Sequence, residues 1–153
     1  MKYIAAMGSL ALLVSGCATQ MVEYNAKSAC AEQGKKAFIY NSKQNGIPLV
    51  IESASAMSVC VGPDDVIHLP STFGADAISG SNLHGAGIVS VDAGSIAEKA
   101  GLKANDIIYE FAGHPISLVS DLRVAINSMS SGDQALMKLR RNGGNDITAT
   151  AHF

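Results

Sequence analysis

The sequence lacks any excess of positive charge. Its 153 residues include 11 lysines and arginines against 13 aspartates and glutamates, so the formal net charge is −2 at pH 7. Proteins that bind nucleic acids carry a basic surface for the phosphates, and this composition excludes such a surface. Charged residues make up only 16% of the chain and hydrophobic residues 48%, which also excludes a disordered chain. The length suits one domain, or one small domain with an appendage.

Long hydrophobic runs are missing as well. The longest, residues 4–14, is interrupted by a glycine and a serine, whereas a membrane-spanning helix needs about 20 mostly apolar residues. Lys2 lies before this run, and the small residues Ser15 and Gly16 follow it. This arrangement is typical of an export signal. A short buried helix is the alternative interpretation.

The sequence VSGC at residues 14–17 resembles the lipobox of bacterial lipoproteins. In that family a cysteine after small residues receives a diacylglyceryl group, which implies that residues 1–16 are a signal peptide and that Cys17 carries the lipid, palmitate included. Each buried methylene of the lipid adds about 0.8 kcal/mol, so several acyl chains would anchor the protein to a membrane. Ala18 after the cysteine resembles the pattern of lipoproteins sorted to the outer membrane, where the protein would face the periplasm.

Only two other cysteines are present, Cys30 and Cys60. An exported chain enters an oxidising compartment, where two thiols favour a disulfide. Closing a loop of about 30 residues would contribute roughly 3–4 kcal/mol. Two buried, unreactive thiols are the alternative. The chain has no CxxC pair and its four histidines are scattered, so the sequence predicts neither a metal site nor a cofactor.

Residues 17–65 are predicted to form an N-terminal segment, a tether followed by a small helix–strand unit. The predicted elements are a tether or helix start over residues 18–29, a helix over 28–36, strands over 37–40 and 48–61, and turns at 45–46 and 62–65. The disulfide would join the helix to the end of the second strand.

From residue 66 the pattern becomes regular. Predicted strands cover residues 87–91, 107–111, 134–141 and 146–153. Ser95 is predicted to cap a short helix, with Glu98 completing a capping box and Gly101 ending it. Ser120 is predicted to cap a second helix, which has an apolar stripe that includes Ile126. The expected fold class is α+β, mainly β.

The stretch GSIAEKAGL at residues 94–102, followed by DII at 106–108, resembles the PDZ domains of bacterial envelope proteins. It is especially similar to those appended to high-temperature-requirement serine proteases. Asn105 stands where that family usually has glycine, and Ile96 where it usually has proline. The resemblance covers roughly residues 66–153 and implies a PDZ-like, partly open β-barrel with two helices, preceded by the disulfide-linked segment.

The resemblance also implies a site for an extended peptide, usually a C-terminus, which adds a strand to a sheet edge beside a helix. Such a site needs an apolar–Gly–apolar loop whose amides hold the terminal carboxylate, and STFGA at residues 71–75 is the candidate. The expected peptide-binding residues are Phe73, Gly74, Ala75, Asp76 and Ile78 from the loop and the strand after it, and Val119, Arg123 and Ile126 from the second helix.

Within this predicted site, Phe73, Ile78 and Ile126 would line an apolar pocket for the terminal side chain of the peptide. Arg123 would pair with an acidic group of the ligand, or lie solvated on the helix. The helix stripe alone leaves a simpler interpretation open, since any packed helix needs one.

Catalytic motifs are absent. The sequence has no Gly-x-Ser-x-Gly, and its histidines have no serine or aspartate at a spacing typical of a catalytic site. The acidic pair Asp64-Asp65 lies in a predicted turn, and the glycines at 85 and 87 precede a strand rather than a phosphate-binding helix. The sequence therefore predicts no enzymatic activity.

Together these features predict a lipid-anchored envelope protein whose PDZ domain binds a peptide of another envelope protein, with no nucleic acid, metal or cofactor. The oligomeric state is left open. One alternative is a structural or assembly subunit with a degenerate groove, acting through its N-terminal segment or self-association. Another is an accessory subunit that presents substrates to a separate protease.

Overall fold

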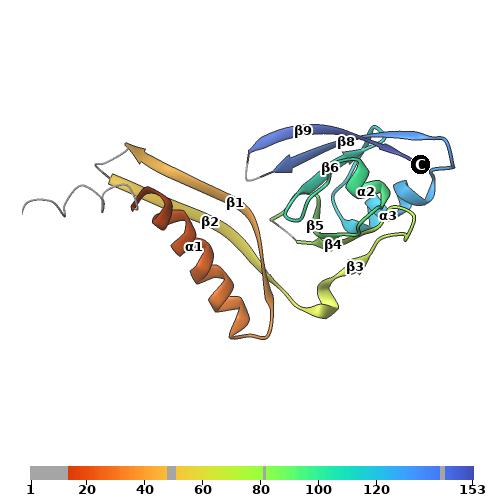
Figure 1. Ribbon diagram of the computed structural model, residues 1–153. Coiled ribbons are helices and arrows are strands. Elements are labelled where there is room, and N and C mark those ends of the chain that lie inside the picture. Colours follow the sequence, from red (N-terminus) through yellow and green to blue (C-terminus); the bar gives the residue numbers. More distant parts are fainter. Residues whose placement is uncertain (1–13, 48–50, 81, 142–143) are drawn as a thin grey trace, which may run out of the picture.

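The computed structural model describes residues 14–47, 51–80, 82–141 and 144–153. Residues 1–13 of the predicted signal peptide, and the first residues of the strand predicted over 48–61, lie outside the described residues. The chain forms two units side by side (Figure 1). The N-terminal unit, residues 14–61, is a helix and a β-hairpin. The C-terminal unit, residues 62–153, is rich in β-strands.

The N-terminal unit is a long helix packed on a two-stranded antiparallel sheet (Figure 1). Helix α1 (Val14–Ala31) contacts both strands, β1 (Lys36–Ile47) and β2 (Ile51–Val61). Among the described residues, no helix combines the length and the apolar character needed to cross a membrane.

The helix predicted over residues 28–36 is wrong in its bounds. The backbone N–H of Gly34 donates to the carbonyl of Ala31 at 2.9 Å, and that of Lys35 donates to the carbonyl of Cys30 at 2.9 Å. These bonds satisfy carbonyls of the last helical turn and end the helix there. The strand predicted over 37–40 is part of the longer strand β1, and the turn predicted at 45–46 is wrong, because both residues pair with β2.

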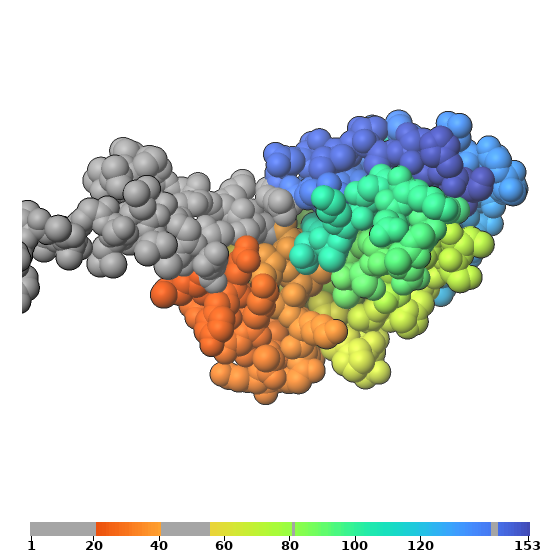
Figure 2. Space-filling view, viewed as in Figure 1, coloured from red at the N-terminus to blue at the C-terminus, as the bar shows by residue number. Residues whose placement is uncertain are grey.

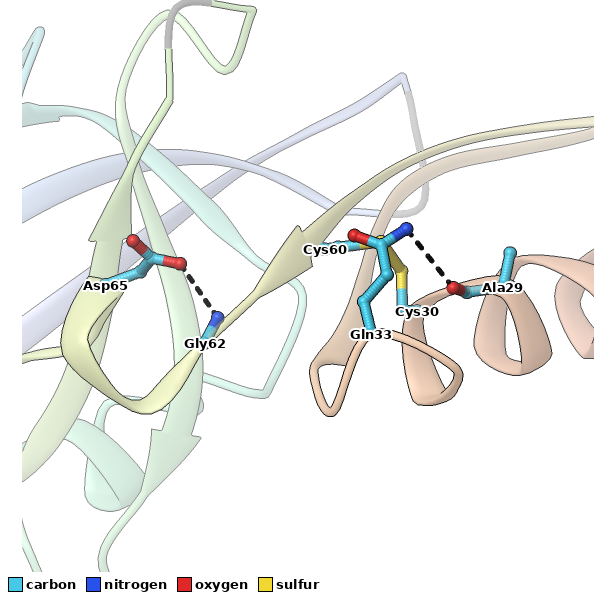
Figure 3. The surroundings of a disulfide bond; sticks show 6 residues. All are labelled: Ala29, Cys30, Gln33, Cys60, Gly62 and Asp65. Atoms are coloured by element: carbon cyan, nitrogen blue, oxygen red, sulfur yellow. Dashed lines mark hydrogen bonds between the residues drawn. A yellow bond between two sulfur atoms is a disulfide. The ribbon is translucent and has the colours of Figure 1, made fainter.

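A disulfide fixes α1 on the hairpin. Cys30, in the last turn of α1, is bonded to Cys60 near the end of β2, with their Cα atoms 5.2 Å apart, which confirms the predicted pairing. Figure 3 shows Gln33 beside the bond, and its Nε2 donates to the carbonyl of Ala29 at 3.4 Å. In the chain-entropy description a cross-link over this separation stabilises the folded state by about 3–4 kcal/mol.

The C-terminal unit is built on one open antiparallel sheet. Its strands are β3 (Ile67–His68), β4 (Ala75–Ser79), β5 (Ala86–Val91), β6 (Ile107–Phe111), β7 (His114–Pro115), β8 (Gln134–Arg141) and β9 (Asn145–His152). They pair in the order β3-β4-β5-β6-β8-β9, and β7 pairs with β6. A 3-10 helix, η1 (Pro63–Asp65), and two α-helices, α2 (Ile96–Lys99) and α3 (Val119–Asn127), complete the unit. The predicted class, α+β and mainly β, is confirmed, although the sheet is open and does not close into a barrel.

The start of α2 confirms the predicted cap. The Ser95 hydroxyl accepts the N–H of Glu98 at 3.1 Å. In a capping box the Glu98 carboxylate would accept the N–H of the cap residue, Ser95. It instead accepts the N–H of the residue before it, Gly94, at 2.7 Å. Asn105, which stands in place of a family glycine, has φ +71°. Asparagine is among the few non-glycine residues that tolerate this conformation, so the replacement keeps the turn.

The cap predicted for α3 is wrong. The helix begins at Val119, so Ser120 lies inside the first turn rather than before it. The carboxylate of Asp121 accepts the N–H groups of Ser117 and Leu118 at 3.0 and 2.9 Å. A charged acceptor near a helix N-terminus also interacts favourably with the helix dipole, which makes Asp121 the better cap.

The two units meet at Phe38 of β1. Cys60 faces α1 through the disulfide, and its cross-strand partner is Ala37. Because side chains alternate along a strand, Phe38 points to the opposite face of the hairpin. There it is 3% exposed and packs with Val61 and with side chains of the C-terminal unit, Ile78 among them. Figure 2 shows the N-terminal unit adjoining the C-terminal one.

Candidate functional site

The loop before β4 is a tight turn around one acceptor. The backbone N–H groups of Phe73 and Gly74 both donate to the carbonyl oxygen of Pro70, at 2.8 and 3.0 Å. Gly74 has φ +72°, and a Cβ at this position would lie 2.4 Å from the Cβ of Ser95. Only glycine fits there. Two N–H groups of the loop therefore converge on a carbonyl oxygen of the same chain, and the carboxylate-binding role of this loop stays a prediction.

The carbonyl groups of the loop are also held. Phe73 accepts the N–H of Ala97 at 2.9 Å, and Gly74 accepts the N–H of Asp92 at 3.0 Å. Phe73 itself is fully buried, and its ring lies 6.1 Å from that of Phe111 and 6.2 Å from that of Phe153. Because the Phe73 carbonyl shares a peptide plane with the N–H of Gly74, its bond to Ala97 holds that N–H in its orientation toward Pro70.

The edge of β4 opposite β5 is covered by β3, a segment of the same chain. The two strands pair in antiparallel register. One residue beyond β3, the N–H of Leu69 donates to the carbonyl of Ala75 at 3.0 Å. A strand added from outside would need the same backbone groups of β4. The sheet edge on which the predicted site depends is therefore occupied by residues 66–70.

Three polar side chains cross β3, β4 and β5 in a row. The Nδ1 atom of His68 is hydrogen-bonded to Oδ1 of Asp76, and the hydroxyl of Ser90 donates to Oδ2 of Asp76 at 2.8 Å. The side chain of His68 is 83% exposed. A hydrolytic triad needs the histidine between the serine and the carboxylate. Here the Asp76 carboxylate lies between the other two side chains. The three residues therefore link neighbouring strands through hydrogen bonds, but the serine has no histidine beside it to act as a base.

Helix α3 forms the other wall near β4. The N–H of Val119, at the start of the helix, donates to the hydroxyl of Ser79 at the end of β4, at 2.8 Å. Val119 and Ile126 are both buried in the main core, while Arg123 is exposed. Of the three α3 residues predicted to face a peptide, only Arg123 is therefore open to solvent.

The residues predicted to line one pocket lie on different sides of β4. Ala75 and Ala77 point into the core that also holds Ile126. Ile78 points to the opposite face, where it packs in the cluster around Phe38. Side-chain alternation along the strand explains the split. Phe73, Ile78 and Ile126 are thus not brought together, and the binding roles of the remaining residues stay a prediction.

An open cleft of about 320 Å³ lies beside the loop. Thr72 of the loop, Ile96 at the start of α2 and Ile126 in α3 contribute to its walls. Met129 and Phe153 add further apolar surface. Asn127, Ser130 and Ser131 complete the lining, so the walls of the cleft are partly apolar and partly polar. Within the described residues, no three His, Cys, Asp or Glu side chains are grouped so that they could hold a metal ion.

A family model described as PDZ domain matches residues 50–151, more than half of the chain. The chain belongs to the PDZ domain family. The match begins inside the N-terminal unit, in the segment that leads into β2, and ends in β9. The resemblance noted in the sequence is thereby confirmed, and PDZ domains bind peptides or protein C-termini.

Similar curated proteins are large proteases. The magnetosome formation protease MamE of Magnetospirillum gryphiswaldense is 38% identical over 84 residues, 54% of this chain and 10% of that protein. The serine protease Do-like HtrA of Bacillus subtilis is 40% identical over 83 residues, 52% of this chain and 18% of that protein. A probable periplasmic serine endoprotease, DegP-like, of Chlamydia trachomatis is 39% identical over 61 residues, 40% of this chain and 12% of that protein. The chain therefore spans less than a fifth of each relative's length.

Sequence reasoning missed β3. The strand has only two residues, too few for a periodic pattern. A signal was nonetheless present: Val66-Ile67-His68-Leu69 is followed by a proline and a serine, a turn pair that predicts a hairpin with the strand after the loop. In this PDZ domain, the edge of β4 opposite β5 is covered by β3.

Proposed function

We propose that this chain is a non-catalytic, lipid-anchored protein of the bacterial envelope whose PDZ domain binds an extended peptide segment of another envelope protein at β4. The observation that carries the proposal is the loop, where two amides converge on one oxygen atom. A peptide C-terminus supplies a charged oxygen at that position, which such amides bind more strongly than a neutral one. The cleft beside Ile126, whose walls are partly apolar, would take a side chain of the partner.

Three features support a binding role without catalysis. The family match covers a PDZ domain, and the relatives named as proteases match this chain over less than a fifth of their own length. The serine of the polar trio has a carboxylate rather than an imidazole as its partner.

The proposed location in the envelope rests on three observations: the lipobox-like residues 14–17, the disulfide, and the periplasmic protease named among the relatives.

Peptide binding is tested by charge reversal on α3. A library of peptides with free C-termini is screened against the wild-type protein, and the best ligands with acidic residues are measured again with Arg123→Glu. Losing the pairing and adding repulsion is expected to weaken binding about tenfold, which corresponds to ~1.4 kcal/mol. Val124→Glu is the matched control, because Val124 is the next residue of α3 and is 69% exposed. Equal losses in the two variants, or a library without ligands, would contradict the proposal.

The lipid anchor is tested separately. Cys17→Ser removes the thiol that would carry the lipid, so the protein is expected to move from the membrane fraction to the soluble fraction of the cells. Cys30→Ser with Cys60→Ser is the control, because it removes the disulfide and leaves Cys17 in place. Membrane retention of the Cys17→Ser protein would count against acylation at this residue.

The occupied edge of β4 favours one alternative function. If residues 66–70 never leave, the groove is degenerate, and the chain would act as a structural or assembly subunit through its N-terminal unit. The exposed side chains of Met21 and Tyr24 on α1 would then contribute to the contact. This alternative predicts that crosslinks to partners formed in intact cells map to α1 rather than to α3.

A further inference from the structure

We propose that residues 66–70 are an internal ligand of the PDZ site, which a foreign peptide must displace, and that their side-chain pattern defines the ligand class: an extended segment with apolar residues at two alternate positions. The part that concerns foreign peptides rests on the function proposed above. The internal occupation rests on the structure of residues 66–77 alone.

The backbone contacts are those of an added strand. Segment 66–70 runs antiparallel to β4, with Ile67 opposite Ala77 and Leu69 donating its N–H to the carbonyl of Ala75 at 3.0 Å. It ends at the loop, where the carbonyl of Pro70 accepts the two converging amides. Both features of peptide capture, the paired edge and the filled amide cradle, are thus supplied by one short stretch of this chain.

The side chains of the segment alternate between core and solvent. Leu69 is 5% exposed and lies in the core cluster that contains Ile126, and Ile67 packs against the same cluster. Between them, His68 points outward and bonds to Asp76. The site therefore accepts an apolar, a polar and an apolar residue in succession. A carboxylate on the polar residue would meet Asp76 and be repelled.

Segment 66–70 would compete with a foreign peptide for the same edge of β4. It pairs through only two residues of regular strand, so the backbone pairing that must break is short, and the burial of Leu69 is its main anchor. Because it is tethered, its effective concentration at the site is about millimolar. A foreign peptide binds only to the fraction of molecules in which the segment has left, so its apparent dissociation constant rises in proportion. Loosening the segment should therefore tighten the binding of any peptide supplied in solution.

The test uses the segment itself as the probe. A fluorescent peptide with the sequence of residues 65–70, DVIHLP, is titrated into the full-length protein and its variants. Leu69→Ser removes the buried anchor and is expected to bind the probe at least tenfold more tightly than the wild type. His68→Asp faces Asp76 with a like charge and is expected to bind it about fivefold more tightly. Because His68 is exposed, this second variant leaves the core intact if Leu69→Ser fails to fold.

Three control measurements test whether the probe binds at β4. Asp64→Ser, an exposed change just before the segment, should behave as the wild type. A probe with serine in place of its isoleucine and leucine should bind none of the proteins. In spectra of the labelled variants, the amides of Gly74 and Ala77 should shift on adding the probe. Equal binding of the probe to wild type and variants, or no binding to folded His68→Asp, would overturn the internal-ligand proposal.

The same variants separate this proposal from the function on which it rests. If the DVIHLP probe binds the loosened variants and no foreign C-terminal peptide does, residues 66–70 are an internal ligand and the proposed recognition of other proteins is wrong. If foreign peptides bind the wild type and the variants equally well, peptide recognition stands and displacement of residues 66–70 is not required.

Discussion

Replacing Arg141 with methionine is expected to lower the free energy of unfolding by about 3–5 kcal/mol, because it leaves a buried charge without its partner. Asp106 is the one fully buried charged side chain in the part of the chain that the structure describes. Its two carboxylate oxygens accept Nε and Nη2 of Arg141 at 2.7 and 2.6 Å. The N–H of Lys103 donates to the same carboxylate at 2.8 Å.

This pair holds the turn before β6 against β8. Besides Asp106, the guanidinium of Arg141 reaches the carbonyl of Gly101 at the end of the α2 turn, at 2.8 Å. The Asp106 carboxylate raises the pKa of Arg141 through the hydrogen bonds between them, so the arginine stays charged at any pH at which the protein is folded. Methionine keeps most of the apolar stem of the side chain, so the loss reports on the charge rather than on packing.

Chemical denaturation followed by circular dichroism measures the loss. Lys138→Met is the matched control on the same strand, because Lys138 pairs with Glu110 at 2.9 Å but its side chain is 43% exposed. Surface pairs contribute little, so this variant should unfold close to the wild type. Combining Arg141→Met with Asp106→Leu removes both charges and should recover part of the stability. Similar losses in Arg141→Met and Lys138→Met would contradict the role of the buried pair.

The elements that the sequence predicted well are those with a local cause. Strands β6 and β8 were placed at their observed bounds, since each lies between turn residues, β6 is a short apolar run and β8 alternates between buried and more exposed side chains. The Ser95 cap follows from a side chain bonding three residues along the chain. The disulfide followed from the number of cysteines and the expected compartment. None of these predictions required knowledge of distant contacts.

The elements that were missed depend on distant contacts. The start of α3 was misplaced because a serine and an aspartate both suit a cap, and sequence alone does not rank them. Ile78 was expected at a peptide pocket, but its neighbour is Phe38, forty residues earlier in the chain. The covering of β4 by β3 is a pairing of two short segments across a loop. The local sequence pattern therefore predicted the loop at residues 71–75. The segment that covers the neighbouring edge of β4 depends on a pairing that the local pattern does not determine.

Replacing Phe38 with alanine is expected to separate the two units, with a loss of about 3–5 kcal/mol at their contact. The ring of Phe38 lies directly on the backbone of β5: a Cβ added at Gly87 would be 2.8 Å from its Cζ atom. Glycine at 87 therefore makes room for the ring. Because Ile78 of β4 lies in the same cluster, the N-terminal unit supports the strand that carries the peptide site from its outer face.

A double-mutant cycle tests this contact. Gly87→Ala forces the new methyl group into the ring and should destabilise the same contact on its own. In the Phe38→Ala background the two closest ring atoms are gone and only Cδ1 of Leu83, at 3.0 Å, remains near the new methyl group. The methyl group should then cost less, so the two effects should not add. Tyr24→Ala is the aromatic control, because Tyr24 is 70% exposed on α1. Thermal unfolding and limited proteolysis should show the N-terminal unit opening first in each single variant. Additive losses, or one transition at the wild-type temperature, would show that Phe38 does not couple the units.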